Sequence, residues 1–210
     1  MKQFLKIGCL AIVGIFVMFV VIGYFIGDDS NEKLKPEIKA DNMEIIEKPM
    51  LTDSILNILV SGSFRADKDE FKKISFYYHN LTPKYINKDW VFPYIGKNES
   101  NVWMRFKMQY EDDDWLFINK VQFLIDGEPT DFASGSFKRD NNGGRIWEWG
   151  DIEVNEVMAI ILRSIANSKE AKVRYTGNQY HNDRTITTRE KKVMLETLAV
   201  YDSLNTYRLN

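Results

Sequence analysis

The sequence predicts an α+β protein, mainly antiparallel β in a sandwich-like sheet, preceded by one N-terminal transmembrane helix. Three observations lead to this prediction. Residues 7–26 contain no charged side chain, short runs of aromatic and β-branched residues follow from residue 74 onward, and two stretches in the C-terminal third have helical periodicity. Strands and helices do not alternate regularly, which argues against a doubly wound fold.

The first element is the apolar segment 7–26, which has Lys2 and Lys6 before it and Asp28 and Asp29 after it. A helix of this length covers about 30 Å, which matches the hydrocarbon core of a bilayer. Positive flanks tend to stay in the cytoplasm, so we expect a single-pass protein of the cell membrane whose C-terminal part lies outside. The segment is too long for the apolar part of a signal peptide and lacks its cleavage pattern, which favours an uncleaved signal anchor.

Composition divides the chain into a transmembrane anchor (1–27), a polar tether (28–49) and an extracytoplasmic α+β domain (50–210). The single cysteine, Cys9, lies in the predicted anchor, so the outer domain has neither a disulfide nor a Cys-based zinc site. All 30 acidic residues follow the anchor, where they outnumber the basic ones. This balance gives no electrostatic reason to bind nucleic acid, and we expect no such partner.

Strand signals come from five runs: 74–78, 102–110, 115–125, 145–149 and 171–175. Apolar and polar residues alternate in 102–110, which predicts one buried and one solvated face. An acidic stretch separates this run from 115–125, so we expect the two runs to form an antiparallel hairpin. The second run is apolar on both faces at its start, which indicates a central strand. Residues 140–144, Asp-Asn-Asn-Gly-Gly, predict a further hairpin turn.

Helices are expected at about 151–166 and 187–204. In the first, apolar residues recur every three or four positions, and Asp151 is the expected N-cap. In the second, Thr187 and Glu190 have the spacing of a capping box. A weaker pattern predicts a short helix over 51–60.

No catalytic motif is found. The chain contains neither of the two Gly-rich nucleotide-binding motifs, G-x-G-x-x-G and G-x-x-x-x-G-K-[ST]. It also lacks the G-x-S-x-G motif of a serine nucleophile. The acidic stretch 111–114 lacks both the ligand spacing and the glycine of an EF-hand calcium-binding loop. We therefore expect a non-enzymatic protein without a cofactor or a metal site.

Two alternatives for catalysis remain open. His181, oriented by Asp183 two residues on in an expected loop, could act as a general base. A carboxylate pair for glycoside hydrolysis could be assembled from Glu148, Asp151 and Glu153, because Trp147 and Trp149 flank Glu148. Alternation along a strand places both rings opposite Glu148, which favours buried rings and a solvated carboxylate. His79 is expected to be a polar residue that opens a loop.

A candidate binding patch for a ligand or partner is formed by Arg174, Asn178, His181, Asp183 and Arg184, which fall around one strand–loop–helix junction. Loops often carry binding residues, and this one offers donors and acceptors together. In the competing interpretation, Arg174 pairs with an acid of a neighbouring strand and the loop only turns the chain.

The expected function is that of a membrane-anchored extracytoplasmic module of the cell envelope, which binds an envelope protein or another ligand. One alternative is an envelope hydrolase that uses His181 with Asp183, or Glu148. A second alternative is a membrane assembly component that acts through its transmembrane helix. The organisation, with one N-terminal anchor and a small outer domain, resembles that of many bacterial envelope proteins.

Overall fold

The computed structural model describes residues 47–209, which belong to one compact unit spanning 46–210. The predicted anchor 1–27 and nearly all of the predicted tether 28–49 lie outside the described residues. Within the described range, no helix has the length and apolar character needed to cross a membrane.

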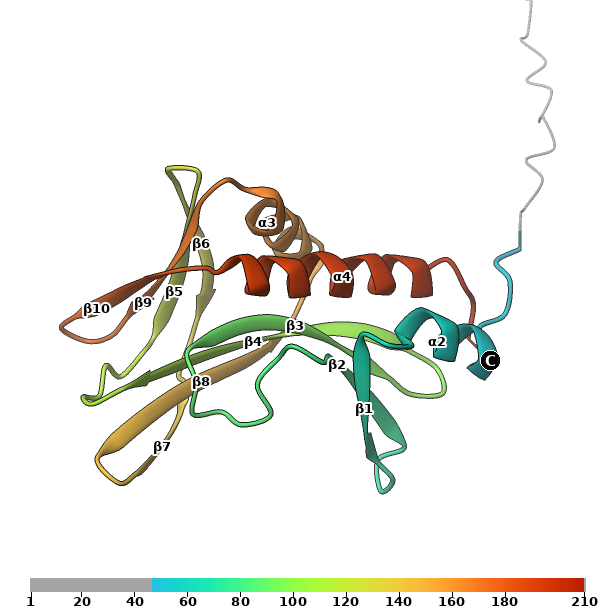
Figure 1. The fold of residues 1–210 in the computed structure, drawn as a ribbon, viewed down its shortest axis with the longest axis horizontal. Coiled ribbons are helices and arrows are strands. Elements are labelled where there is room, and N and C mark those ends of the chain that lie inside the picture. Colours follow the sequence, from blue (N-terminus) through green and yellow to red (C-terminus); the bar gives the residue numbers. More distant parts are fainter. Residues whose placement is uncertain (1–46, 210) are drawn as a thin grey trace, which may run out of the picture. The chain divides into compact units, whose positions relative to one another are not determined.

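The described part is α+β, with three helices and two antiparallel sheets (Figure 1). Its elements follow in the order α2 (Asp53–Val60), β1 (Phe64–Asp69), β2 (Ile74–His79), β3 (Trp90–Lys97), β4 (Val102–Asp112), β5 (Lys120–Ile125), β6 (Glu128–Ser134), β7 (Lys138–Asn142), β8 (Arg145–Glu153), α3 (Glu156–Asn167), β9 (Ala171–Thr176), β10 (His181–Thr185) and α4 (Thr188–Leu204). The predicted α+β class is confirmed.

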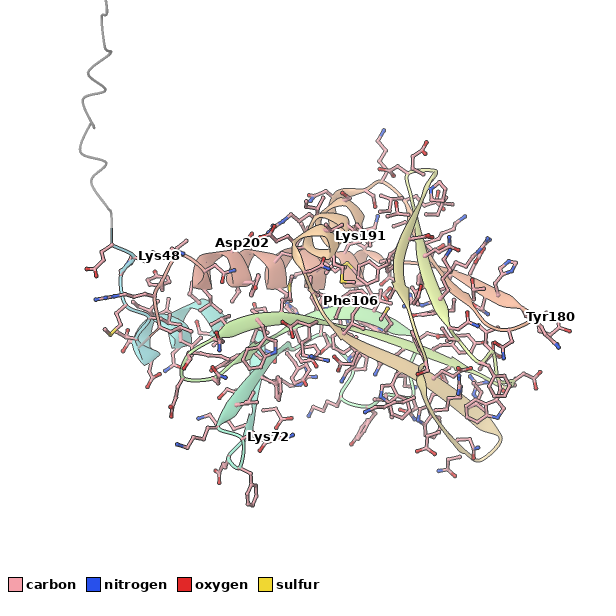
Figure 2. All side chains as sticks on the ribbon, turned by 180° about the vertical axis from the view of Figure 1, so that it is seen from behind. Lys48, Lys72, Phe106, Tyr180, Lys191 and Asp202 are labelled. Atoms are coloured by element: carbon pink, nitrogen blue, oxygen red, sulfur yellow. The ribbon has the colours of Figure 1, made fainter. Side chains whose placement is uncertain are left out.

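The larger sheet has six strands in the order β1-β2-β3-β4-β8-β7, and the smaller has four in the order β10-β9-β5-β6. Helix α4 lies along one face of the larger sheet, and α3 packs beside α4 (Figure 1). One buried cluster joins both sheets, α3 and α4. Its members include Phe106 of β4 (Figure 2), Phe123 of β5 and Leu162 of α3. Burial of this shared core is the main stabilising contribution to the fold.

Four of the predicted strands coincide with β2, β4, β8 and β9, and the predicted turn at 140–144 joins β7 to β8. The predicted hairpin between 102–110 and 115–125 is wrong, because β4 pairs with β3 and β8 whereas β5 pairs with β6 and β9. Residues 115–119 form no strand and carry the chain from one sheet to the other. The remaining part, β5, is an internal strand as expected.

Strand β3 was not predicted, because Pro93 and Gly96 interrupt its apolar run. The register shows why both residues are tolerated. Strand β2 pairs with β3 only from Ile95 onward, so Pro93 lies where the strand is bonded on one side alone. At Gly96 the Trp103 indole of β4 occupies the space that a Cβ atom would need.

Helix α4 begins with the predicted capping box of Thr187 and Glu190, and α2 confirms the predicted short helix. The expected start of the other helix at residue 151 is wrong. Strand β8 continues to Glu153, and Asn155 is the N-cap of α3. Asp151 lies within β8 instead, and its carboxylate accepts hydrogen bonds from Arg105 of β4 and Tyr94 of β3.

The two ends of the described chain pair with each other. Leu51 N–H donates to the Arg208 carbonyl, and Arg208 N–H donates to the Pro49 carbonyl, each at 2.9 Å. The last residues of the predicted tether are therefore bound to the C-terminal segment of the domain.

Candidate functional site

The patch predicted from the sequence lies on the four-stranded sheet. The stretch expected to be a loop is in large part a strand, β10, which pairs in register with β9. Only residues 177–180 turn the chain. The prediction of a polar loop is therefore wrong for His181, Asp183 and Arg184, because their backbone groups complete a sheet.

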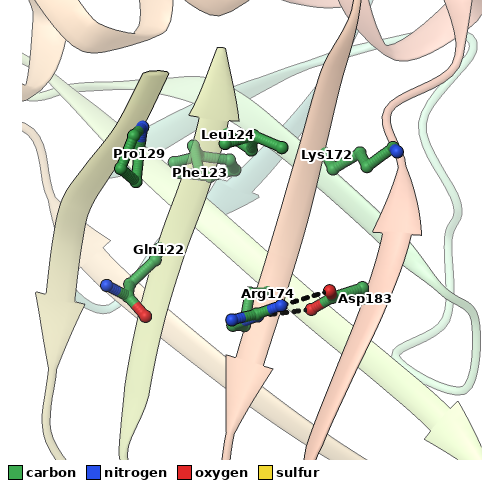
Figure 3. A pocket seen from close by; sticks show the side chains of 7 residues that line it. All are labelled: Gln122, Phe123, Leu124, Pro129, Lys172, Arg174 and Asp183. Carbon is green, nitrogen blue, oxygen red and sulfur yellow. Dashed lines mark hydrogen bonds and ion pairs between the residues drawn. The ribbon is translucent and has the colours of Figure 1, made fainter. Parts of the chain in front are cut away.

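Arg174 and Asp183 face each other across β9 and β10. The guanidinium Nε and Nη2 donate to the two carboxylate oxygens at 2.7 and 2.6 Å, which makes a bidentate ion pair (Figure 3). Hydrogen bonding from Arg174 lowers the pKa of Asp183. Both side chains are about half exposed, so the pair contributes little to stability, on the order of 0.2–1 kcal/mol.

The remaining predicted residues do not join this pair. Arg184 lies on the opposite face of β10, where its guanidinium donates to the buried carboxylate of Glu190 at 2.7 and 3.0 Å. The Asn178 side chain accepts a hydrogen bond from Asn119. His181 is exposed on the face that carries Asp183, without a hydrogen bond between these two described side chains. The structure thus divides the predicted patch between two faces of a sheet.

Around the Arg174–Asp183 pair, the outer face of the small sheet has a shallow hollow of about 130 Å³, with Gln122, Leu124 and Pro129 in its lining (Figure 3). Beside it, Asp131 accepts from Gln122 at 2.6 Å and from Lys120 at 3.0 Å. The charged groups of this face are largely matched with one another, which leaves little unbalanced charge for a ligand.

Glu148 is fully buried, and the prediction of a solvated carboxylate between buried rings is wrong. Its oxygens accept hydrogen bonds from the backbone N–H groups of Leu116, Phe117 and Ile118 at 2.7–2.8 Å, and from Arg139 Nε at 3.0 Å. These four donors offset the cost of removing the charge from water. Trp147 and Trp149 lie on the other face of β8 and are partly exposed.

His79 ends β2 and precedes the connection to β3, as expected, but it is buried. Its Nδ1 accepts from the backbone N–H of Leu81 at 3.1 Å, so Nε2 carries the proton that is shared with Glu196 of α4 at 2.7 Å. The imidazole therefore joins the end of β2 to the long helix. This is a structural role.

A second site, which the sequence did not predict, lies on the face of the large sheet opposite α4. The connection between β2 and β3, residues 80–89, folds back over this face (Figure 1). Arg65 of β1 holds it by donating to the carbonyls of His79 and Pro83, and Gln109 of β4 donates to the carbonyl of Tyr85. Between the connection and the sheet is a hollow of about 430 Å³, which we call the basic hollow.

The basic hollow is lined by three cationic side chains, Arg65, Lys84 and Lys107, and by one carboxylate, Asp67. Neither Arg65 nor Lys84 forms an ion pair with a carboxylate of the described residues. Burial lowers the pKa of Arg65, although Tyr78 and Asp67 act in the opposite direction. The positive charge of this site is therefore only partly compensated.

Tyr78 forms the aromatic wall of the basic hollow. Its ring stacks on that of Tyr94 at 4.7 Å, and the ring centroid lies 5.4 Å from Arg65 Cζ and 5.8 Å from Lys107 Nζ. Cations near a ring face are attracted by its quadrupole, which helps to hold both groups in place. Burial raises the pKa of Tyr78 to about 12, so the hydroxyl is neutral at ordinary pH.

Gln109 completes the wall. It is 1% exposed, and its Oε1 atom is buried without a hydrogen-bond partner among the described residues. Lys107 and Gln109 belonged to the predicted polar face of 102–110, and Tyr78 to the predicted strand run 74–78. Arg65, Tyr78 and Lys84 come from three other segments, so no local spacing could have joined them.

Comparisons with protein families, with curated proteins and with solved structures find no match for this chain.

Proposed function

We propose that the protein is a non-enzymatic binding module of the cell envelope, anchored in the membrane by residues 7–26 with its folded domain outside the cytoplasm. The observation that supports binding is the basic hollow, in which Arg65, Lys84 and Lys107 line one cavity with incomplete charge compensation. A concave site with a few convergent polar groups is the usual form of a ligand site.

The alternative of an envelope hydrolase has less support from the geometry. Glu148 is fully buried and bonded to four donors, so its oxygens are not available to a substrate. Asp183 is held by both donors of Arg174 and makes no hydrogen bond to His181. The imidazole of His181 therefore lacks the carboxylate partner that would orient it as a general base.

The location outside the cytoplasm rests on the charge asymmetry around 7–26. It is tested by replacing exposed Asn142, at the end of β7, with cysteine and treating intact cells with a membrane-impermeant maleimide. We expect the N142C variant to be labelled before lysis, whereas the wild-type chain, whose only cysteine is Cys9, stays unlabelled. Labelling of N142C only after lysis would contradict the proposed orientation.

Binding is tested by photocrosslinking in the native host. A photoreactive phenylalanine replaces Tyr85, which is 75% exposed on the connection over the basic hollow. A matched probe replaces Tyr180, which is 72% exposed at the tip of the β9–β10 hairpin (Figure 2). We expect a discrete adduct from position 85, identified by mass spectrometry.

An adduct from position 180 alone would place the contact near Arg174 and Asp183 instead. If neither probe gives an adduct in correctly exported protein, the binding function is wrong. The second alternative, an assembly component acting through its membrane helix, is tested by exchanging 7–26 for an unrelated apolar helix. Loss of function with the anchor still inserted would favour it.

A further inference from the structure

We propose that the basic hollow binds an oxyanion, that is, a phosphate or carboxylate group of a small polar molecule. This inference rests on the proposed binding function and adds the chemistry of the ligand. It combines the charge balance of the hollow, the placement of its cationic groups and an unmet hydrogen-bonding group in its wall.

The charge of the basic hollow is opposite to that of the chain as a whole. The protein has a formal net charge of −2, yet Arg65, Lys84 and Lys107 line the hollow together with only one carboxylate, Asp67. A second carboxylate, Asp151, lies 3.6 Å from Lys107 Nζ but is already bonded to Arg105 at 2.8 Å. Like charges gathered in a partly desolvated cavity repel one another, and a bound anion would relieve this repulsion.

Two of the three cationic groups, Arg65 and Lys107, are already held in position. Arg65 is fixed by hydrogen bonds to two carbonyls, at 2.8 and 3.2 Å, and its ring contact with Tyr78 is shared by Lys107. A guanidinium has five N–H groups, so these two bonds leave donors for a ligand. Groups that are ordered before binding lose less entropy when the ligand arrives.

The wall of the hollow also has an unmet polar group, which distinguishes it from a packing defect. Gln109 lines the hollow, and its Oε1 lacks a partner among the described residues. A buried acceptor without a partner is costly, and native structures rarely retain one without a use. Because Oε1 only accepts, it pairs not with the oxyanion but with a donor elsewhere on the ligand, so the hollow fits a polar molecule that carries a hydroxyl beside its anionic group.

The test is isothermal titration calorimetry on the full-length chain in a non-ionic detergent. The probes are inorganic phosphate, glycerol 3-phosphate and glucuronate, with neutral glucose as the comparison. We expect saturable binding of at least one anionic probe, weakened by added salt, and none of glucose. Binding of the phosphates alone, or of glucuronate alone, identifies which oxyanion the site takes.

Two lysines of one segment provide a matched pair of variants. Lys84 and Lys88 are both exposed on the connection 80–89, but only Lys84 lines the hollow. We expect Lys84→Gln to weaken binding about tenfold, or ~1.4 kcal/mol at 25 °C, and Lys88→Gln to leave it unchanged. Lys107→Gln, on the opposite wall, should weaken binding as well, with folding checked by circular dichroism.

Equal weakening by Lys84→Gln and Lys88→Gln would show a general effect of charge and overturn the proposal, as would the absence of binding by every anionic probe. If position 85 still gives an adduct in cells while no anionic probe binds, the ligand chemistry is wrong and the binding function stands. If both experiments fail, both proposals are wrong.

Discussion

At the scale of single residues, the most consequential side chain is Glu148. Its carboxylate on β8 binds three consecutive backbone N–H groups of the segment between β4 and β5, 30–32 residues earlier in the chain. These bonds hold the crossing between the two sheets, at a place where the backbone has no strand partner and Phe117 has a positive φ of 59°. A buried charge here acts as a structural connector rather than as a catalytic group.

Replacement of Glu148 by alanine is therefore expected to destabilise the fold strongly. The change leaves Arg139 and three N–H groups without their acceptor, and breaking such a buried arrangement costs about 3–5 kcal/mol. The measurement is urea unfolding followed by tryptophan fluorescence. Glu153→Ala, at the exposed end of the same strand, is the control and should change stability by less than about 0.5 kcal/mol. Equal stability of the two variants would contradict the role of Glu148.

The Arg174–Asp183 pair predicts a dependence on pH. Because hydrogen bonding from Arg174 lowers the pKa of Asp183 below 3.8, the pair stabilises the folded state above that pH. This stabilisation is lost as the pH falls through the lowered, folded-state pKa. Arg174→Gln should return the pKa of Asp183 toward 3.8, as measured by carboxyl NMR titration, whereas Lys172→Gln should change it little. If the pKa of Asp183 is the same in Arg174→Gln as in the wild-type chain, the ion pair does not persist in solution.

At the scale of elements, Glu190 connects α4 with both sheets. It completes the capping box with Thr187, accepts from Arg184 of β10, and accepts from the backbone N–H of Val91 in β3 at 3.0 Å. The cap that the sequence predicts is thus also the place where the helix is joined to the sheets. Its local pattern revealed the cap but not these distant contacts.

The contribution of the helix cap to stability can be measured by comparing alanine variants of two adjacent threonines. Thr187→Ala removes the acceptor of the Glu190 N–H and should destabilise the fold by about 1 kcal/mol. Thr188→Ala, one residue further and also exposed, keeps the cap and serves as the control. The comparison uses thermal unfolding, and a larger loss for Thr188→Ala would mean that the cap is not what begins the helix.

The pairing of β3 with β4 depends on Gly96. An alanine at this position would overlap the Trp103 indole, so we expect Gly96→Ala to cost about 1–3 kcal/mol. In a Trp103→Ala background the same change should cost much less, because the overlapping ring is gone. Denaturant unfolding of the four proteins in this double-mutant cycle gives the interaction free energy directly. Equal costs in both backgrounds would exclude the steric explanation.

At the scale of the whole molecule, the basic hollow is a product of the tertiary arrangement. The connection 80–89 covers the side of the hollow that faces away from the sheet. Strand β1 contributes Arg65, and the middle of the large sheet contributes Lys107 and Gln109. None of these segments forms a site alone.

Binding in the hollow should therefore stabilise the whole folded state. A ligand at about 100 times its dissociation constant adds about 2.7 kcal/mol to the free energy of unfolding when it binds only the folded protein. We expect the anionic probe that binds in calorimetry to raise the melting temperature of the wild-type chain and of Lys88→Gln. At the same concentration, the rise should be smaller for Lys84→Gln. If the melting temperature rises equally in the wild-type chain, Lys88→Gln and Lys84→Gln, the anion binds outside the basic hollow.

Part of this fold and little of the site could be predicted from the sequence. Periodicity and turn residues identified β2, β4, β8 and β9, and the Asn-Gly-rich stretch 140–144 identified the turn between β7 and β8. The sheet to which each strand belongs could not be predicted, and β4 and β5 were paired wrongly for that reason. Of the predicted patch, Arg174 and Asp183 do meet, but as partners of each other.

The sequence by itself determined the features that depend on residues close together in the chain. These are the α+β class, the short helix α2, the capping box of α4 and the hairpin at 140–144. Only the tertiary structure decided that Glu148 is buried, that His79 binds α4, and that Arg65, Lys84 and Lys107 surround one hollow. The physical reason is range. Caps, turns and periodicity arise from neighbouring backbone groups, whereas the burial of a charge depends on donors from distant segments, which meet only once the core has formed.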